Sequence, residues 1–311
     1  MYGTMTTPQV GGEVPGVVFI AGSGPTDRNW ISPLLPGTNG SAALIAHALA
    51  EEGFASLRYD KRASGPHVAE NFPQLMGKLS METHRDEVAS AVEQLAQQPA
   101  IRTERIFALA NSEGTLHALN YQRQKPGRPF AGLILTGPPG RSVGAVARSQ
   151  LEAQATRVDN GDGLLALYEE AIARFLAGQP ANPDPALPEG VRALIQSLES
   201  PANLPFSREL WTTDASLWLR DVNVPTLIII GKKDLQVDYQ IDGAALRTSA
   251  QGNLTITFSF PDNANHVLKY EPRPRSALRG EDVGSRYNAN DAELDRETMD
   301  AILHWLGNQA H

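Results

Sequence analysis

The stretch that decides the fold is Ile106-Phe107-Ala108-Leu109-Ala110-Asn111-Ser112-Glu113-Gly114-Thr115-Leu116. Its first part is a short apolar run, which is typical of a strand buried on both faces of a sheet. Its last part begins a helical pattern, so the residues from Ala110 to Gly114 must turn the chain directly from a strand into a helix. A strand, a tight turn and a helix in immediate succession predict an α/β fold.

Short apolar or β-branched runs alternate with helical patterns on both sides of this stretch. We expect further strands at residues 17–20, 55–59, 133–135, 226–230 and 254–260. We expect helices around residues 44–49, 88–95 and 299–306, where apolar residues recur at helical spacing. A capping pattern, Thr83-His84-Arg85-Asp86, is expected near the start of the second helix. This order predicts a mostly parallel central sheet covered by helices on both faces.

Residues 141–220 interrupt the alternation, because they contain helical patterns only. The strand pattern resumes after Pro225, so we expect a helical cap at 141–220 inserted into a core formed by residues 1–140 and 221–311. Ligands bind at the carboxyl ends of the strands in open α/β sheets, and the cap is expected to cover that edge. The alternative is that these helices pack on the side of the core.

Composition excludes several classes of function. The chain has 311 residues, no cysteine and a formal net charge of −8. The absence of cysteine excludes disulfides, thiolate metal sites and cysteine nucleophiles. An acidic chain without a dense basic run is not typical of a nucleic-acid partner, and no apolar window is long enough for a membrane span. The first five residues show no signal-peptide pattern, which favours a cytoplasmic location unless a leader has been removed.

The turn around Ser112 matches the nucleophile elbow, G-x-S-x-G, with Ala110 in place of the first glycine. The serine of such a turn has a strained backbone, so the residues two positions to either side must be small. This geometry is expected to raise the Ser112 hydroxyl above the sheet. It also leaves the backbone N–H of Glu113 free at a helix N-terminus, where it can stabilise an oxyanion. The alternative is that Ser112 only caps the following helix.

Three more segments resemble the α/β-hydrolase superfamily, in the order that the family has them. VVFIAGSGPTDR at 17–28 resembles the strand and oxyanion loop of the carboxylesterase and serine aminopeptidase-like branch, often written H-G-S-G-P-x-D-R. LRYDKR at 57–62 resembles the R-Y-D-K-R segment after the next strand, and PTLIIIGKKD at 225–234 resembles the strand that delivers the catalytic acid. The S-E-G of the elbow fits this branch too. The resemblance implies an α/β-hydrolase fold with a cap and a serine hydrolase that needs no cofactor. Ala21 stands where the family has the histidine of the oxyanion loop.

A catalytic serine needs a base, and the base needs a carboxylate that orients it. In this family the chain order is serine, acid, histidine. Of the seven histidines, only His266 lies in a loop after the last expected core strand, so we assign it as the general base. The resemblance places the acid at Asp234, although Asp238 and Asp262 are rivals.

The second oxyanion donor is expected in the Gly22-Ser23-Gly24 turn, most simply the backbone N–H of Ser23. Asp27 and Arg28 are expected to brace this loop by ion pairing. The sequence therefore predicts a serine carboxylesterase for a small-molecule ester. Ser112 would attack the ester carbonyl, His266 would move the proton, and the N–H groups of Glu113 and Ser23 would hold the oxyanion.

Other functions stay open on the same residues. A Rossmann site is excluded because the third glycine of its fingerprint would have to be at position 27, which is Asp27. An aminopeptidase-like, thioesterase or acyltransferase activity remains an alternative, as does a non-catalytic ligand-binding role. The oligomeric state is also open.

The cap residues bear on these alternatives. An aminopeptidase needs a carboxylate in its pocket to bind the substrate amine, and the candidates in the cap are Glu169, Glu170 and Glu209. The apolar residues of the cap instead favour an uncharged acyl or alcohol group. They include Trp211, Leu217 and Trp218.

Overall fold

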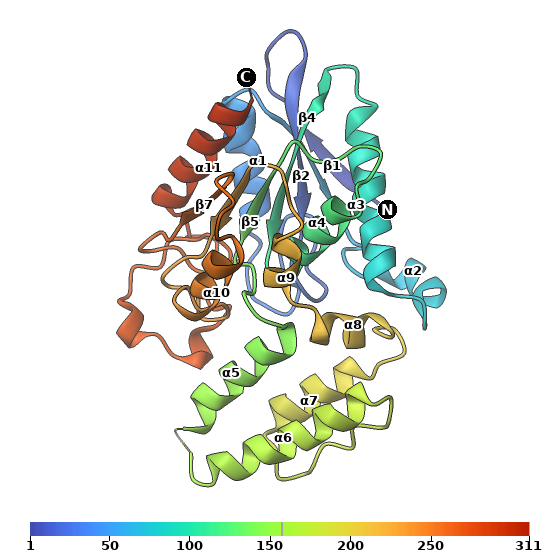
Figure 1. Ribbon diagram of the computed structural model, residues 1–311, viewed down its shortest axis with the longest axis vertical. Helices are drawn as coiled ribbons and strands as arrows, with labels where there is room; N and C mark the ends of the chain where they lie inside the picture. The colour runs from blue at the N-terminus through green and yellow to red at the C-terminus, as the bar shows by residue number, and fades with distance from the viewer. Residues whose placement is uncertain (157, 311) are drawn as a thin grey trace.

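Seven strands form one sheet in a computed structural model that describes residues 1–156 and 158–310 (Figure 1). Their order across the sheet is β1-β3-β2-β4-β5-β6-β7. β1 pairs antiparallel with β3, and every other neighbouring pair is parallel. The strands are β1 (Gly3–Thr6), β2 (Val14–Ile20), β3 (Ala55–Tyr59), β4 (Ile101–Asn111), β5 (Gly132–Thr136), β6 (Thr226–Ile229) and β7 (Ile256–Ser259).

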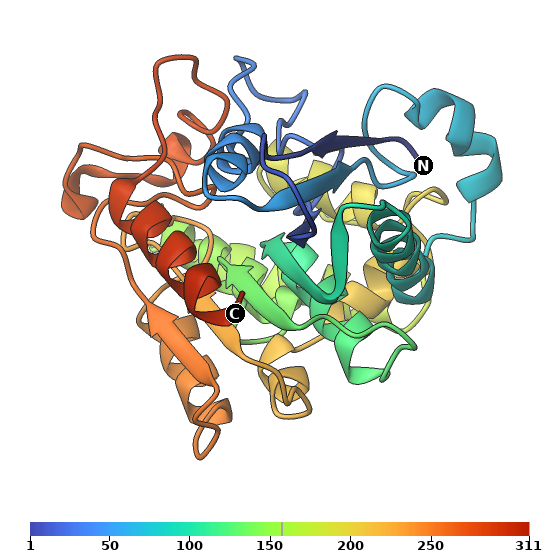
Figure 2. The ribbon, with the colours of Figure 1, turned by 90° about the horizontal axis from the view of Figure 1, so that it is seen from above.

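Helices cover both faces of the sheet (Figure 2). α1 (Ser41–Glu51) and α11 (Arg296–Gln309) lie on one face, where they pack against Val17 and Phe19 of β2. α3 (Met81–Ala96), α4 (Glu113–Arg123) and α10 (Ile241–Ser249) lie on the other, with Val18 and Ile20. Successive residues of a strand point to opposite faces, so a strand between two helical layers must be apolar throughout. The predicted fold class is confirmed.

α3 begins one turn earlier than the sequence predicted. Its N-cap is Ser80, whose Oγ accepts the backbone N–H of Thr83 at 3.1 Å. Thr83 Oγ1 accepts the backbone N–H of Ser80 in return, at 2.9 Å. The pattern beginning at Thr83 therefore lies inside the helix, because the residue that caps the helix N-terminus is Ser80, three residues earlier.

The segment expected to form a cap consists of helices in the described residues. They are α5 (Val143–Ala155), α6 (Gly161–Leu176), α7 (Glu189–Leu198), α8 (Phe206–Thr212) and α9 (Ala215–Leu219). Figure 1 shows α5, α6 and α7 set apart from the sheet, and these helices share an apolar cluster of their own that includes Phe175 and Ile195. α9 instead packs into the main core through Ala215 and Leu219. The division into core and cap stays a prediction.

The remaining elements are short. They are α2 (Val68–Leu75) and the 3-10 helices η1 (Arg275–Ala277) and η2 (Gly280–Asp282). Within residues 1–156 and 158–310, no helix has both the length and the apolarity that crossing a membrane requires.

Candidate active site

Ser112 occupies a strained turn between β4 and α4. Its backbone has φ 54° and ψ −124°, a combination that residues with side chains rarely adopt. A Cβ on Gly114 would lie 2.4 Å from the carbonyl oxygen of Ile20 on β2, so only glycine fits there without movement. Ala110, on the other side of the turn, is fully buried in the core. The close approach of α4 to β2 therefore requires glycine at position 114.

His266 and Asp234 form a buried hydrogen-bonded pair. Nδ1 of His266 lies 2.7 Å from Oδ2 of Asp234. The other oxygen, Oδ1, accepts the backbone N–H groups of Gln236 at 2.7 Å and Val237 at 3.0 Å. Two backbone donors thus fix the carboxylate, and its free oxygen faces the imidazole.

The two rival carboxylates have other partners. Asp238 Oδ1 accepts the backbone N–H groups of Gln240 and Ile241 at the start of α10. Asp262 is exposed and forms an ion pair with Lys232 at 2.5 Å. Among these three described carboxylates, only Asp234 contacts His266.

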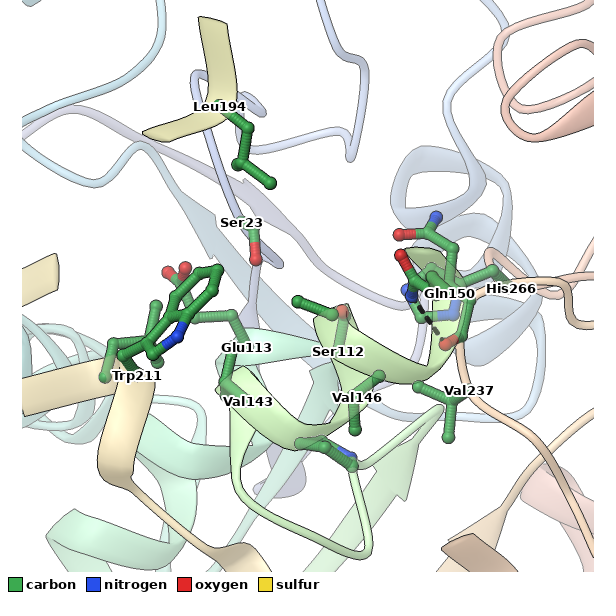
Figure 3. Close-up of a pocket in the computed structure, with 14 residues that line it drawn as sticks. Ser23, Ser112, Glu113, Val143, Val146, Gln150, Leu194, Trp211, Val237 and His266 are labelled. Atoms are coloured by element: carbon green, nitrogen blue, oxygen red, sulfur yellow. Dashed lines mark hydrogen bonds between the residues drawn. The ribbon is translucent and has the colours of Figure 1, made fainter. Parts of the chain in front are cut away.

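Ser112 and His266 line two cavities that also share Ser23. The first has a volume of about 240 Å³ and mostly apolar walls, many of them from α5, α7 and α8 (Figure 3). Its apolar residues are Pro139, Val143, Val146, Ala147, Leu194, Leu210, Trp211 and Val237. The second has a volume of about 170 Å³ and a more polar wall. Its polar residues include Thr26, Ser32, Asn111, Gln236, Tyr287 and Asn288.

Tyr287 is a site residue that sequence reasoning missed. Its ring lies over the imidazole of His266, with centroids 6.2 Å apart and planes 28° from parallel. Its hydroxyl accepts a hydrogen bond from Gln236 Nε2 at 2.8 Å. Burial, together with the carboxylate of Asp234, raises the pKa of Tyr287 far above its usual value, so the phenol stays neutral. Tyr287 lies in the long irregular segment before α11, where no sequence pattern indicated a function.

The carboxylates considered for amine binding point elsewhere. Glu169 and Glu170 form exposed ion pairs with arginines of α5 and α6. Glu209 accepts the backbone N–H of Met81 at the start of α3. None of the three is among the described residues that line the two cavities.

Of the three apolar cap residues considered, only Trp211 is among the described residues that line the two cavities at Ser112. Leu217 is 53% exposed on α9. Trp218 lies under the guanidinium of Arg123, 5.1 Å from its ring centroid. The expectation that Leu217 and Trp218 shape the pocket is wrong, because α9 returns to the core rather than to the cavity.

The loop after β2 is braced across the sheet. Arg28 forms an ion pair with Asp60, which follows β3, at 2.5 Å. Asp27 is not its partner, since Oδ1 of Asp27 accepts the backbone N–H groups of Asn29 and Ile31. Two of the segments that resemble the hydrolase family, 17–28 and 57–62, are thus in direct contact.

Comparison with known proteins agrees with this architecture. Residues 37–158 match the family model described as serine aminopeptidase, S33. The structure of proline iminopeptidase from Mycobacterium smegmatis superimposes with a TM-score of 0.56 at 14% identity, covering 99% of this chain and 94% of that one. The α/β hydrolase GrgF from a Penicillium species gives 0.54 at 14% identity, covering 99% and 98%. The chain has the α/β-hydrolase fold.

One curated relative is similar over nearly the whole of this chain. Esterase EstD of Thermotoga maritima is 22% identical over 307 residues, which are 98% of this chain. This chain spans 65% of the length of EstD.

Proposed function

We propose that this α/β hydrolase is a serine carboxylesterase. The observation that carries the proposal is the strained Ser112 beside a buried, hydrogen-bonded pair of His266 and Asp234. A strained serine at the end of a buried strand costs free energy, and such strain persists where function requires it. A helix cap alone would not require the neighbouring imidazole and carboxylate.

The chemistry follows from the roles of these groups. Ser112 Oγ attacks the ester carbonyl while the imidazole of His266 takes its proton, and Asp234 stabilises the imidazolium. The N–H groups of Ser23 and Glu113 hold the oxyanion of the tetrahedral intermediate. His266 then donates the proton to the leaving alcohol, and water, activated in the same way, releases the acid from the acyl-enzyme.

The two cavities suggest which ester is cleaved. An apolar acyl chain gains about 0.8 kcal/mol for each methylene that it buries, and the apolar cavity offers such burial. The second cavity carries hydroxyl and amide groups, which suit the alcohol portion and the incoming water. We assign the acyl group to the first cavity and the alcohol to the second, with the inserted helices α5 and α7 acting as a cap over the acyl group.

An aminopeptidase-like activity is the second candidate, because the matching family model carries that description. Such an enzyme needs a carboxylate that is free to bind an amine. Glu113 is the one carboxylate among the described residues that line the two cavities, and it is already paired with Lys61. This pairing favours an uncharged substrate.

The test combines labelling and kinetics. A fluorophosphonate probe should label the wild-type protein at Ser112, and Ser112→Ala should lose both labelling and several orders of magnitude in kcat. The matched control is Ser90→Ala, which removes an exposed hydroxyl on α3. p-Nitrophenyl butyrate should be cleaved far faster than an aminoacyl anilide. Normal turnover by Ser112→Ala would refute the mechanism, and faster cleavage of the anilide would favour the second candidate.

A further inference from the structure

Lys61 is a buried lysine that the proposed acyl transfer does not use. It follows β3 and is 3% exposed. Its ammonium donates to the backbone carbonyl of Gly22 and lies 3.1 Å from Oε1 of Glu113. Removing an ammonium group from water costs several kcal/mol unless its partners are well placed. These two contacts therefore stabilise the buried charge of Lys61, and they tie it to Gly22 and Glu113.

Each partner belongs to a segment that carries a proposed oxyanion donor. The carbonyl of Gly22 and the N–H of Ser23 are parts of one planar trans peptide unit, so they point in opposite directions. When Lys61 holds the Gly22 oxygen, the Ser23 N–H must point away from Lys61. Ser23 lines both cavities beside Ser112. A Cβ on Gly22 would lie only 3.1 Å from the Cβ of Ser112, so this peptide lies against the nucleophile.

Glu113 provides the other half of the arrangement. Its backbone N–H is in the first turn of α4, where helical N–H groups have no partner within the helix. Glu113 as a whole is 5% exposed. Its Oε1 lies 3.1 Å from the ammonium of Lys61 and 3.1 Å from Nε2 of His117. Burial alone would raise the pKa of Glu113, but Lys61 and His117 outweigh it and hold the pKa well below its usual value. The side chain thus stays ionised, and its ion pair with Lys61 persists.

We propose that Lys61 and the side chain of Glu113 are positioning residues that fix the two oxyanion donors relative to each other. One buried ion pair, together with the hydrogen bond of Lys61 to Gly22, joins the peptide of Ser23 to the first residue of α4. Ser23, Ser112 and Glu113 line the same cavity (Figure 3). Lys61 is not among the described residues that line either cavity, and the carboxylate of Glu113 is held by Lys61 and His117, so both side chains act through the backbone that they position. The inference rests on the proposed function, because it assumes that an oxyanion forms at Ser112.

A positioning role has a kinetic signature that a merely structural ion pair lacks. The oxyanion exists in the tetrahedral intermediate and not in the bound ester, so misplaced donors lower kcat and leave KM nearly unchanged. A trifluoromethyl ketone forms the same oxyanion when Ser112 adds to it. Its affinity should therefore fall in parallel with kcat.

The test variant is the double substitution Lys61→Met/Glu113→Gln, which removes both charges and leaves no carboxylate buried alone. Its kcat should fall about 100-fold, the scale expected for a misplaced or lost donor. The inhibition constant of the trifluoromethyl ketone should rise by a similar factor. The matched control is Arg62→Met/Glu87→Gln, which removes the next ion pair of the same segment, 2.9 Å long, without touching Gly22 or Glu113. The control should keep the wild-type kcat and inhibition constant even if it unfolds more easily.

Two outcomes would overturn the proposal. One is a double variant with wild-type kcat and wild-type affinity for the ketone. The other is a crystal structure of that variant in which the Gly22–Ser23 peptide keeps its orientation. The crystal structure decides the question even if the wild-type protein neither hydrolyses esters nor reacts with a fluorophosphonate, a result that would refute the proposed function separately.

Discussion

Mild acid should destabilise this protein through His117, a buried histidine of α4 that contacts the carboxylate of Glu113. His117 is 1% exposed, its ring centroid is 4.5 Å from that of His84, and its Nε2 is 3.1 Å from the carboxylate of Glu113. Burial lowers the pKa of His117 to about 4, and the charges of His84 and Lys61 lower it too, whereas Glu113 opposes the change. The folded protein therefore keeps this imidazole neutral at a pH where an unfolded chain would protonate it.

The sign and size of the effect follow from proton linkage. Below pH 6.5, the usual value for histidine, the unfolded chain binds a proton that the folded protein does not, so the free energy of unfolding falls with pH. The loss ends near pH 4, where the folded protein takes up the proton as well. At about 1.4 kcal/mol for each pH unit between these values, His117 costs about 3 kcal/mol in full, and about 2 kcal/mol by pH 5.

Urea unfolding of the wild-type protein and of His117→Gln measures this cost. Glutamine cannot titrate, yet its amide can still donate to Glu113. The variant should therefore gain stability relative to the wild-type protein by about 2 kcal/mol between pH 7 and pH 5. The matched control is His47→Gln, an exposed position on α1, which should follow the wild-type protein. If His117→Gln and the wild-type protein lost stability in parallel over this range, the reasoning would be refuted.

Three further predictions concern the site. Asp234→Asn should lower kcat roughly 10⁴-fold by favouring the wrong imidazole tautomer. Asp238→Asn keeps the oxygen that accepts the N–H groups of Gln240 and Ile241, so it should change kcat and stability little, and equal kinetic effects of the two substitutions would contradict the assignment. Val146→Phe should fill part of the apolar cavity and lower kcat/KM for p-nitrophenyl octanoate more than for p-nitrophenyl acetate. If the ratio of the two kcat/KM values did not change, the acyl group would have to bind elsewhere. Gly114→Ala places a Cβ 2.4 Å from the carbonyl oxygen of Ile20 and should lower the free energy of unfolding in urea by about 3 kcal/mol. An unchanged free energy of unfolding would mean that α4 moves away from β2 at little cost.

The features that the sequence revealed are those set by neighbours along the chain. Apolar runs indicated the buried strands, and a serine flanked at two positions by small residues indicated the strained turn at Ser112. The order of Asp234 and His266 could be anticipated only through the family resemblance. Spacing alone did not separate Asp234 from Asp238, since the choice depends on which oxygen lies 2.7 Å from an imidazole 32 residues away.

The features that the sequence did not reveal depend on contacts across the sheet. The ring of Tyr287 lies beside His266 although it comes from an irregular segment. Leu217 and Trp218 lie away from the two cavities at Ser112 because α9 packs into the main core. No periodicity encodes either placement. Ser80 was missed for a different reason, because a reciprocal cap is defined by two residues and only Thr83 was considered.

The charged residues after β3, Asp60, Lys61 and Arg62, show how contacts across the sheet can nevertheless produce a recognisable sequence motif. β3 and β4 flank β2 in the sheet, so the chain leaving β3 lies beside both the loop after β2 and the start of α4, which follows β4. From there Asp60 binds Arg28, Lys61 binds Gly22 and Glu113, and Arg62 binds Glu87.

These contacts join the loop after β2, α4 and α3 to the end of β3. A substitution of one charge takes a cationic or anionic partner away from the other residue, and that loss is severe where the remaining residue is as buried as Glu87 or Glu113. The segments 17–28, 57–62 and 110–114 should therefore tolerate paired changes better than single ones. The three segments resemble one family together because their side chains contact one another beside Ser112.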